Sequence, residues 1–233
     1  MLPFPALSRS LIAGLLALLA GLQTACVRSG NLVRPDFRAA AVDELLFVSP
    51  IAAVGVIEGA DSVLFNRGSS AESARLLRQT LLAHRQHLRL RGELPLPDTL
   101  RSAVSREVFR AVAGVQRHRR LSGGADLPVL DYLLRGQPQR YLLVTAAQGF
   151  KREKRNYQLQ MIKALGANLL PGSRVIPVRF ESDIHVFIYD GHRRQIVFYN
   201  RTPPHKERDP LDQITVEEQL RGLLLKDFPA LSD

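Results

Sequence analysis

Apolar residues recur along the chain with two different spacings, and the two spacings alternate from one segment to the next. Two runs rich in Val, Ile, Leu and Phe, at 44–58 and 140–148, are typical of buried strands. The sequence HLRLRGEL at 87–94 alternates leucine with arginine, which indicates a half-exposed strand. Because proline cannot donate a backbone hydrogen bond, we expect a bend at Pro50 within the first run.

Helical spacing, with an apolar residue at every third or fourth position, fills the segments between these runs. Two of the helices open on a capping box, in which Ser69 is followed by Glu72 and Thr215 by Glu218. Asp98 is the expected N-cap of the longest helix. The predicted helices cover 69–86, 98–115, 126–134, 159–169 (ended by Pro171-Gly172) and 215–224.

The clearest hairpin signal lies at 174–202, where two strand-like runs flank the turn dipeptide Asp190-Gly191. The predicted order is therefore β-α-β-α-α-β-(α)-β-β-α. This order predicts an α/β (α+β) fold, in which helices pack on a single mixed β-sheet. A chain of 233 residues fits one such domain, which we place at 42–233.

The amino-terminal segment 1–25 is predicted to be a lipoprotein signal peptide. Its apolar run, Leu11 to Leu22, is shorter than the roughly 20 residues that span a bilayer as a helix. The next residues, Leu22-Gln23-Thr24-Ala25-Cys26, resemble the lipobox of bacterial lipoproteins, although Gln23 stands where an aliphatic residue is usual. We therefore expect Cys26 to be the lipidation site. A short uncleaved anchor over 10–27 is the alternative.

Cys26 is the only cysteine of the chain, so it has no disulfide partner, and acylation would account for a lone thiol in the envelope. The polar stretch 26–41 is interpreted as a tether, with an ordered arm packed on the domain as the alternative. Val27, in place of an acidic residue, favours the outer membrane. The expected location is the cell envelope, with the protein lipid-anchored and facing the periplasm.

The chain is basic, with a formal net charge of +10, and basic surfaces attract polyanions. The most concentrated segment is GFKREKRNYQ at 149–158, in which cations lie beside aromatic rings. That combination suits a polymer bearing phosphate or carboxylate groups, although a solvated loop would carry the same residues. The expected partner is an envelope protein or an anionic envelope polymer, and nucleic acid is not expected. The candidate binding residues are Phe150, Lys151, Arg152, Lys154, Arg155 and Tyr157.

Catalytic motifs are absent from the sequence, which contains neither a nucleophile elbow nor a phosphate-binding loop. We therefore predict no enzymatic activity, no cofactor and no metal site. His84 and His87 are spaced like metal ligands, but the arginines beside them would repel a cation. An envelope hydrolase that uses Asp183 and His185 for proton transfer is the main alternative.

Four segments carry a resemblance to known proteins: LLFVSPIAAVGVIE, RYLLVTAAQGFKREKRNY, HVFIYDGHRRQIVFY and TVEEQL. They resemble uncharacterised envelope lipoproteins of the Bacteroidota type. More distantly, the order of strands and helices is similar to the α/β domain of outer-membrane lipoproteins that activate peptidoglycan synthases, and of the lipoprotein subunit of the curli secretion channel. The resemblance implies a binding or assembly role without a reaction. Its curli-channel branch implies an export-pore subunit, whose membrane hairpins would come from 159–188.

Overall fold

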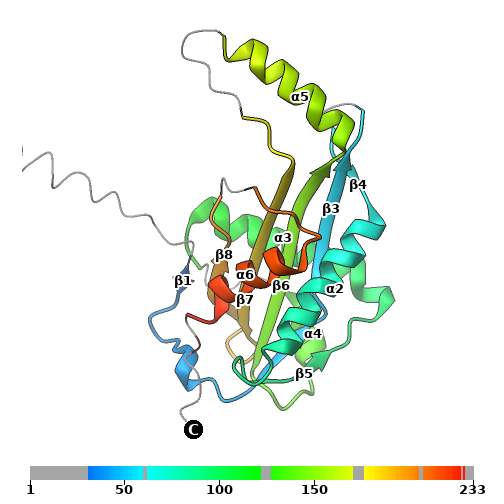
Figure 1. Ribbon diagram of the computed structural model, residues 1–233. Helices are drawn as coiled ribbons and strands as arrows, with labels where there is room; N and C mark the ends of the chain where they lie inside the picture. The colour runs from blue at the N-terminus through cyan, green and yellow to red at the C-terminus, as the bar shows by residue number, and fades with distance from the viewer. Residues whose placement is uncertain are drawn as a thin grey trace, which may run out of the picture.

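The computed structural model describes residues 31–59, 62–121, 127–169, 176–204, 207–226 and 228. These residues form one mixed sheet of eight strands with helices on both faces (Figure 1). The α/β (α+β) class predicted from the sequence is thereby confirmed. The predicted signal peptide 1–25 and the lipidation site Cys26 lie outside the described residues.

The helices and strands have the following bounds. The strands are β1 (Leu32–Val33), β2 (Leu45–Val48), β3 (Ile51–Ile57), β4 (Leu64–Phe65), β5 (Leu90–Leu94), β6 (Tyr141–Arg152), β7 (Phe180–Asp190) and β8 (Gln195–Arg201). The helices are the 3-10 turn η1 (Ala39–Ala41), α2 (Arg67–Ala83), α3 (Asp98–His118), α4 (Pro128–Leu134), α5 (Lys154–Ala167) and α6 (Gln213–Leu224).

The sheet runs in the order β1-β8-β7-β6-β2-β5, and β3 continues along β6 beyond the point where β2 leaves it. Both β2 and β3 pair parallel with β6, Leu45 opposite Tyr141 and Ile51 opposite Ala146. The break between β2 and β3 falls at Pro50, as the sequence predicts. The bend lets β2 pair with β5 and leaves β3 free to pair with β4 on its outer side.

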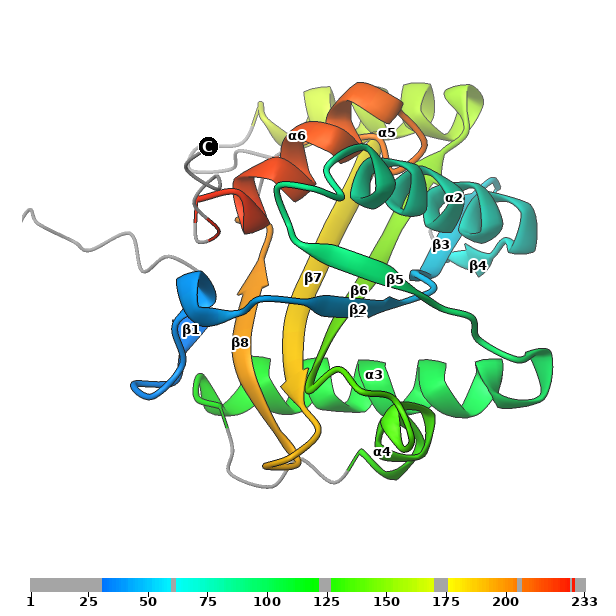
Figure 2. The same ribbon diagram turned by 90° about the horizontal axis from the view of Figure 1, so that it is seen from below.

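The pleat of β6 divides the interior into two hydrophobic cores. Alternate residues of this strand, such as Leu143 and Ala147, face the core beneath α2 and α6. Their neighbours, such as Leu142 and Val144, face the core beneath α3 and α4. Figure 2 shows the two helix pairs on opposite sides of the sheet. Strand β6 is thus buried on both faces from Leu142 to Ala147.

The helix starts differ from the predicted capping boxes. The N-cap of α2 is Asn66, three residues before the expected Ser69, and its side chain accepts a hydrogen bond from the Ser69 N–H at 2.8 Å. In the same way Asp212, not Thr215, caps α6. An Asn or Asp three residues upstream supplies the capping oxygen in both cases. Asp98 is the first residue of α3 and not its N-cap.

Residues 31–41 form an ordered arm on the domain, which was the alternative to a tether for this part of 26–41. Strand β1 pairs antiparallel with β8, Leu32 opposite Tyr199. Phe37 is buried in the core beneath α2 and α6. The chain is therefore held to the sheet from about residue 32 onward.

Candidate functional site

The basic segment 149–158 belongs to a strand and a helix and is not the solvated loop considered as the alternative. Strand β6 continues through it to Arg152, and α5 begins two residues later at Lys154. The extension is stable because β6 is paired on both sides, with Lys151 opposite Val56 of β3 and Phe180 of β7. The candidate binding residues therefore lie on a strand end and on the first turn of a helix.

Strand geometry separates these residues instead of gathering them. Successive side chains of a strand point to opposite faces, so Lys151 projects on the side of α2 and α6, whereas Phe150 and Arg152 project on the other. Lys154 and Arg155 follow on α5 and are exposed. The six predicted residues thus surround the end of the sheet and do not form one patch.

Arg152 is engaged within the domain. Its Nε donates to the Val178 carbonyl oxygen at 3.0 Å, and its Nη1 donates to Asn156 Oδ1 at 3.0 Å. The guanidinium carbon also lies 5.5 Å from the centroid of the Phe150 ring. Arg152 therefore ties the end of β6 to α5 and to the segment before β7, which makes it a positioning residue for the helix.

The base of α5 is fixed by Asn156, which is 3% exposed. Besides accepting from Arg152, the Asn156 amide lies 3.5 Å from the Gly59 carbonyl oxygen. The N–H of Glu153 donates to the Ile57 carbonyl oxygen at 3.0 Å, which joins the helix start to β3. From this base α5 extends beyond the end of the sheet, at the top of Figure 1.

The apolar residues of α5 point away from the domain. Leu159 is 49% exposed, Ile162 66% and Leu165 65%, and their spacing of three residues places them on one face. Leu169, just past the helix, is 85% exposed. We call these four residues the α5 stripe. The residues of α5 that are buried or half-buried are Asn156, Tyr157, Gln160, Ala164 and Ala167.

This arrangement reverses the usual one, in which a surface helix turns its apolar face to the core. Other exposed apolar residues lie at the same end of the sheet. Strand β4 pairs with the last residues of β3, and residues 176–178 lead into β7. Exposed apolar residues that gather at one end of a domain are typical of a contact site. These neighbouring exposed residues are Val63, Leu64, Phe65, Met161, Ile176 and Val178.

The structure brings Asp183 and His185 together, as the hydrolase alternative requires, but His185 is buried and only Asp183 is partly exposed. His185 Nε2 lies 3.3 Å from Asp183 Oδ2, and His185 Nδ1 lies 3.1 Å from the Tyr199 hydroxyl. Burial raises the pKa of Tyr199 to about 12. Partial burial alone would raise the pKa of Asp183, but His185 and a hydrogen bond from Thr202 outweigh it, and this pKa is lowered.

His185 is 1% exposed, so a substrate has no access to its imidazole. The ring instead stacks near Tyr199, with the centroids 6.2 Å apart, and links β7 to β8. His84, the other histidine considered, lies 3.7 Å from Glu217 on α6. No group of three or more metal-ligating side chains occurs among the described residues.

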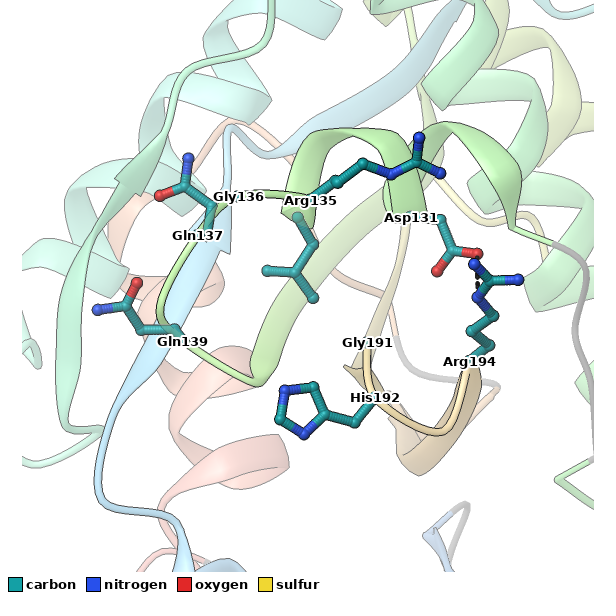
Figure 3. A pocket seen from close by; sticks show the side chains of 9 residues that line it. Asp131, Arg135, Gly136, Gln137, Gln139, Gly191, His192 and Arg194 are labelled. Atoms are coloured by element: carbon teal, nitrogen blue, oxygen red, sulfur yellow. Dashed lines mark ion pairs between the residues drawn. The ribbon is translucent and has the colours of Figure 1, made fainter.

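A cavity of about 260 Å³ opens between the end of α4 and the β7–β8 turn (Figure 3). On one side Asp131 and Arg194 form an ion pair at 3.3 Å. Gln137 and Gln139 lie on the opposite side, and the His192 ring lies between the two sides (Figure 3). The lining residues are Asp131, Leu134, Arg135, Gly136, Gln137, Gln139, Gly191, His192 and Arg194.

The cavity is lined by hydrogen-bonding side chains, and its one carboxylate, that of Asp131, is paired with Arg194. Asp131 also accepts a short hydrogen bond from the Tyr189 hydroxyl, and burial together with this bond raises the pKa of Tyr189. No motif in the sequence predicts this site. Its residues come from α4, from the approach to β6 and from the β7–β8 turn, which only the folded sheet brings together.

Comparison with known proteins identifies no family. No protein-family model matches the chain, and no curated protein matches it. Two PelC dodecamer structures from Paraburkholderia phytofirmans are loosely similar, each with a TM-score of 0.38. One is 12% identical and covers 86% of this chain and 96% of PelC, and the other, a point variant, is 11% identical and covers 85% and 95%.

Among the described residues, no helix has the length and apolar character needed to span a membrane.

Proposed function

We propose that this chain is a lipid-anchored cell-envelope protein whose α/β domain has a non-catalytic binding or assembly role, and that the α5 stripe is its contact surface. The observation that carries the proposal is the orientation of the stripe. Leu159, Ile162 and Leu165 face solvent, while the residues of α5 nearest the domain are mostly small or polar. A helix with this orientation gains its hydrophobic stabilisation from another molecule.

The exposed side chains of the α5 stripe can gain hydrophobic free energy on contact with a partner. Burying a leucine or isoleucine side chain fully is worth about 1.5–3 kcal/mol. The four residues of the α5 stripe leave most of that free energy unused in the isolated domain. Contact with a partner would recover it, without any rearrangement of the two cores beneath the sheet. The fixed base of α5 at Asn156 supports this, because it holds the stripe in a defined position.

The anchor is tested by metabolic labelling with a fatty acid. The wild-type chain is expected to incorporate the label, and the Cys26→Ala chain is expected to remain unlabelled. An unlabelled wild-type chain would overturn the lipid-anchored part of the proposal.

The contact surface is tested by photo-crosslinking in intact cell envelopes. A photoreactive residue replaces Ile162 in one chain and Tyr132 in a control chain, since both side chains are strongly exposed but lie on α5 and α4 respectively. A photoreactive residue at position 162 is expected to give covalent adducts with its contact partner, whether protein or lipid, and one at position 132 is expected to give none. Equal yields at the two positions, or no adduct at position 162, would overturn the α5 stripe as the contact surface.

A further inference from the structure

We propose that the molecule on which the α5 stripe docks is an anionic lipid bilayer, so that α5 lies in the membrane surface and acts as a second attachment point beside the acyl anchor. This inference rests on the proposed function, and it specifies the partner of the same surface. It is carried by the charges of α5, by the polarity of the stripe and by the length of chain between Cys26 and the domain.

The first argument is the charge distribution on α5. The helix Lys154–Ala167 contains three cations, Lys154, Arg155 and Lys163, and no acidic residue. All three are exposed and lie in the same helix as the outward apolar residues. Cations beside exposed apolar residues suit an anionic bilayer surface, because the apolar side chains can enter the acyl boundary while lysine and arginine reach the headgroups.

The second argument is what the stripe lacks. Protein interfaces carry about one hydrogen bond per 100–200 Å² of buried surface. The side chains of Leu159, Ile162 and Leu165 offer no hydrogen-bonding group, and α5 presents them on a helix that projects from the domain (Figure 1). A projecting apolar ridge with a cationic margin needs a groove in a protein partner, but it needs no preformed shape in a fluid bilayer.

The third argument is the reach of the chain. Asn31, where the described chain begins, is the fifth residue after Cys26, and five residue steps of extended chain span at most about 18 Å. Strand β1 then fixes the chain to β8. An acylated Cys26 would therefore hold the domain within about 18 Å of the bilayer, which gives α5 a high effective concentration at the lipid surface.

The test uses the absence of tryptophan from the chain. Ile162→Trp introduces a single fluorescent reporter in the α5 stripe, and Tyr132→Trp is the matched control on α4. Each acylated full-length protein is reconstituted into vesicles of phosphatidylethanolamine and phosphatidylglycerol, with or without brominated acyl chains. The Ile162→Trp emission is expected to shift to the blue and to be quenched by the brominated lipid, whereas the Tyr132→Trp emission is expected to show neither effect.

A charge arm tests the role of the cations. A lysine or arginine near an anionic surface contributes roughly 1 kcal/mol, so Lys154→Gln with Lys163→Gln should lower the ratio of docked to undocked α5 about thirtyfold. The same pair of substitutions should change nothing on vesicles of phosphatidylcholine alone. Equal losses on both kinds of vesicle would overturn the electrostatic part of the proposal.

The remaining outcomes separate this inference from the proposed function. Emission from Ile162→Trp that is unshifted and unquenched overturns docking on lipid. Emission that is shifted to the blue but unquenched by brominated lipid also overturns it, and indicates contact with protein, which leaves the α5 stripe as a contact surface. Failure of the wild-type chain to incorporate a fatty acid overturns the anchor itself, and is detected before any vesicle is made.

Discussion

Arg140, just before β6, forms a bidentate ion pair with Asp190 at the end of β7, with Nε 3.0 Å from Oδ1 and Nη2 2.6 Å from Oδ2. Asp190 is 1% exposed, and its Oδ1 also accepts hydrogen bonds from the backbone N–H groups of His192 and Arg193. The carboxylate therefore closes the β7–β8 hairpin and joins it to β6. The Asp-Gly dipeptide predicted the turn, but not this buried ion pair.

Removing the buried charge is expected to destabilise the fold. Breaking a buried ion pair on one side leaves the other group unpaired and typically costs about 3–5 kcal/mol. Because Arg140 is partly exposed, we expect Asp190→Asn to lower the free energy of unfolding by about 2–3 kcal/mol. Urea denaturation measures the change. The control is Glu72→Gln, which breaks a solvent-exposed pair with Arg75 and should change the free energy of unfolding far less than Asp190→Asn does.

Stability is expected to fall in acid. Burial alone would raise the pKa of Asp190, but the bonds from Arg140 and from the turn amides outweigh it and lower this pKa. A carboxyl whose pKa is lowered by folding stabilises the protein above its unfolded pKa of about 3.9, and this contribution is lost as the pH falls through the folded value. Urea midpoints measured from pH 7 downward should drop below about pH 4, less steeply in Asp190→Asn. Parallel curves would contradict the assignment.

Gly149 is required by the close approach of two strands and not by a flexible loop. A Cβ at this position would lie 2.0 Å from the Glu181 carbonyl oxygen on β7. We expect Gly149→Ala to destabilise the protein by at least about 2 kcal/mol, because the backbone of β7 would have to move. Gly166 of α5 is the matched control. A Cβ there meets nothing within 4 Å, and Gly166→Ala should stabilise the helix by about 0.5–1 kcal/mol.

Substitution of His185 should affect folding and not a reaction. The side chain is buried and contacts both Asp183 and Tyr199, so His185→Ala leaves a cavity and removes one hydrogen-bond partner of the Tyr199 hydroxyl. A loss of about 2–4 kcal/mol is expected from these two effects. His118→Ala, at the exposed end of α3, should leave stability unchanged. A hydrolytic activity that disappears in His185→Gln while the protein remains folded would contradict this account.

The sequence predicted those features that depend on local pattern. The break at Pro50 and the Asp190-Gly191 turn follow from residues close to one another in the chain, and the structure contains both. The alternating strand predicted at 87–94 is shorter than expected, because β5 begins at Leu90 and residues 87–89 lie in a turn. The N-caps Asn66 and Asp212 lie three residues before the predicted caps, because a capping box and a single Asn or Asp cap are competing local signals. Strands β1 and β4 have two residues each, too few for a period to be visible.

The position of the candidate site depends on tertiary structure, so the sequence predicts only its amphipathic helix. The cation cluster at 149–158 lies at the same end of the sheet as the α5 stripe, but the pleat of β6 sends Lys151 and Arg152 to opposite faces. The spacing of Leu159, Ile162 and Leu165 predicted an amphipathic helix. It could not predict that this face turns away from the domain, since the same period is typical of a helix packed on a core.

The role proposed for the α5 stripe requires that its side chains contribute nothing to the free energy of unfolding of the domain. Urea unfolding of Ile162→Gln with Leu165→Gln tests it, with Leu77→Ala in the core beneath α2 as the matched control. We predict a change within about 0.5 kcal/mol for the α5 pair and a loss of about 2–5 kcal/mol for Leu77→Ala. A loss for the α5 pair as large as that of Leu77→Ala would show that the stripe packs on its own domain, and would contradict its role as a contact surface.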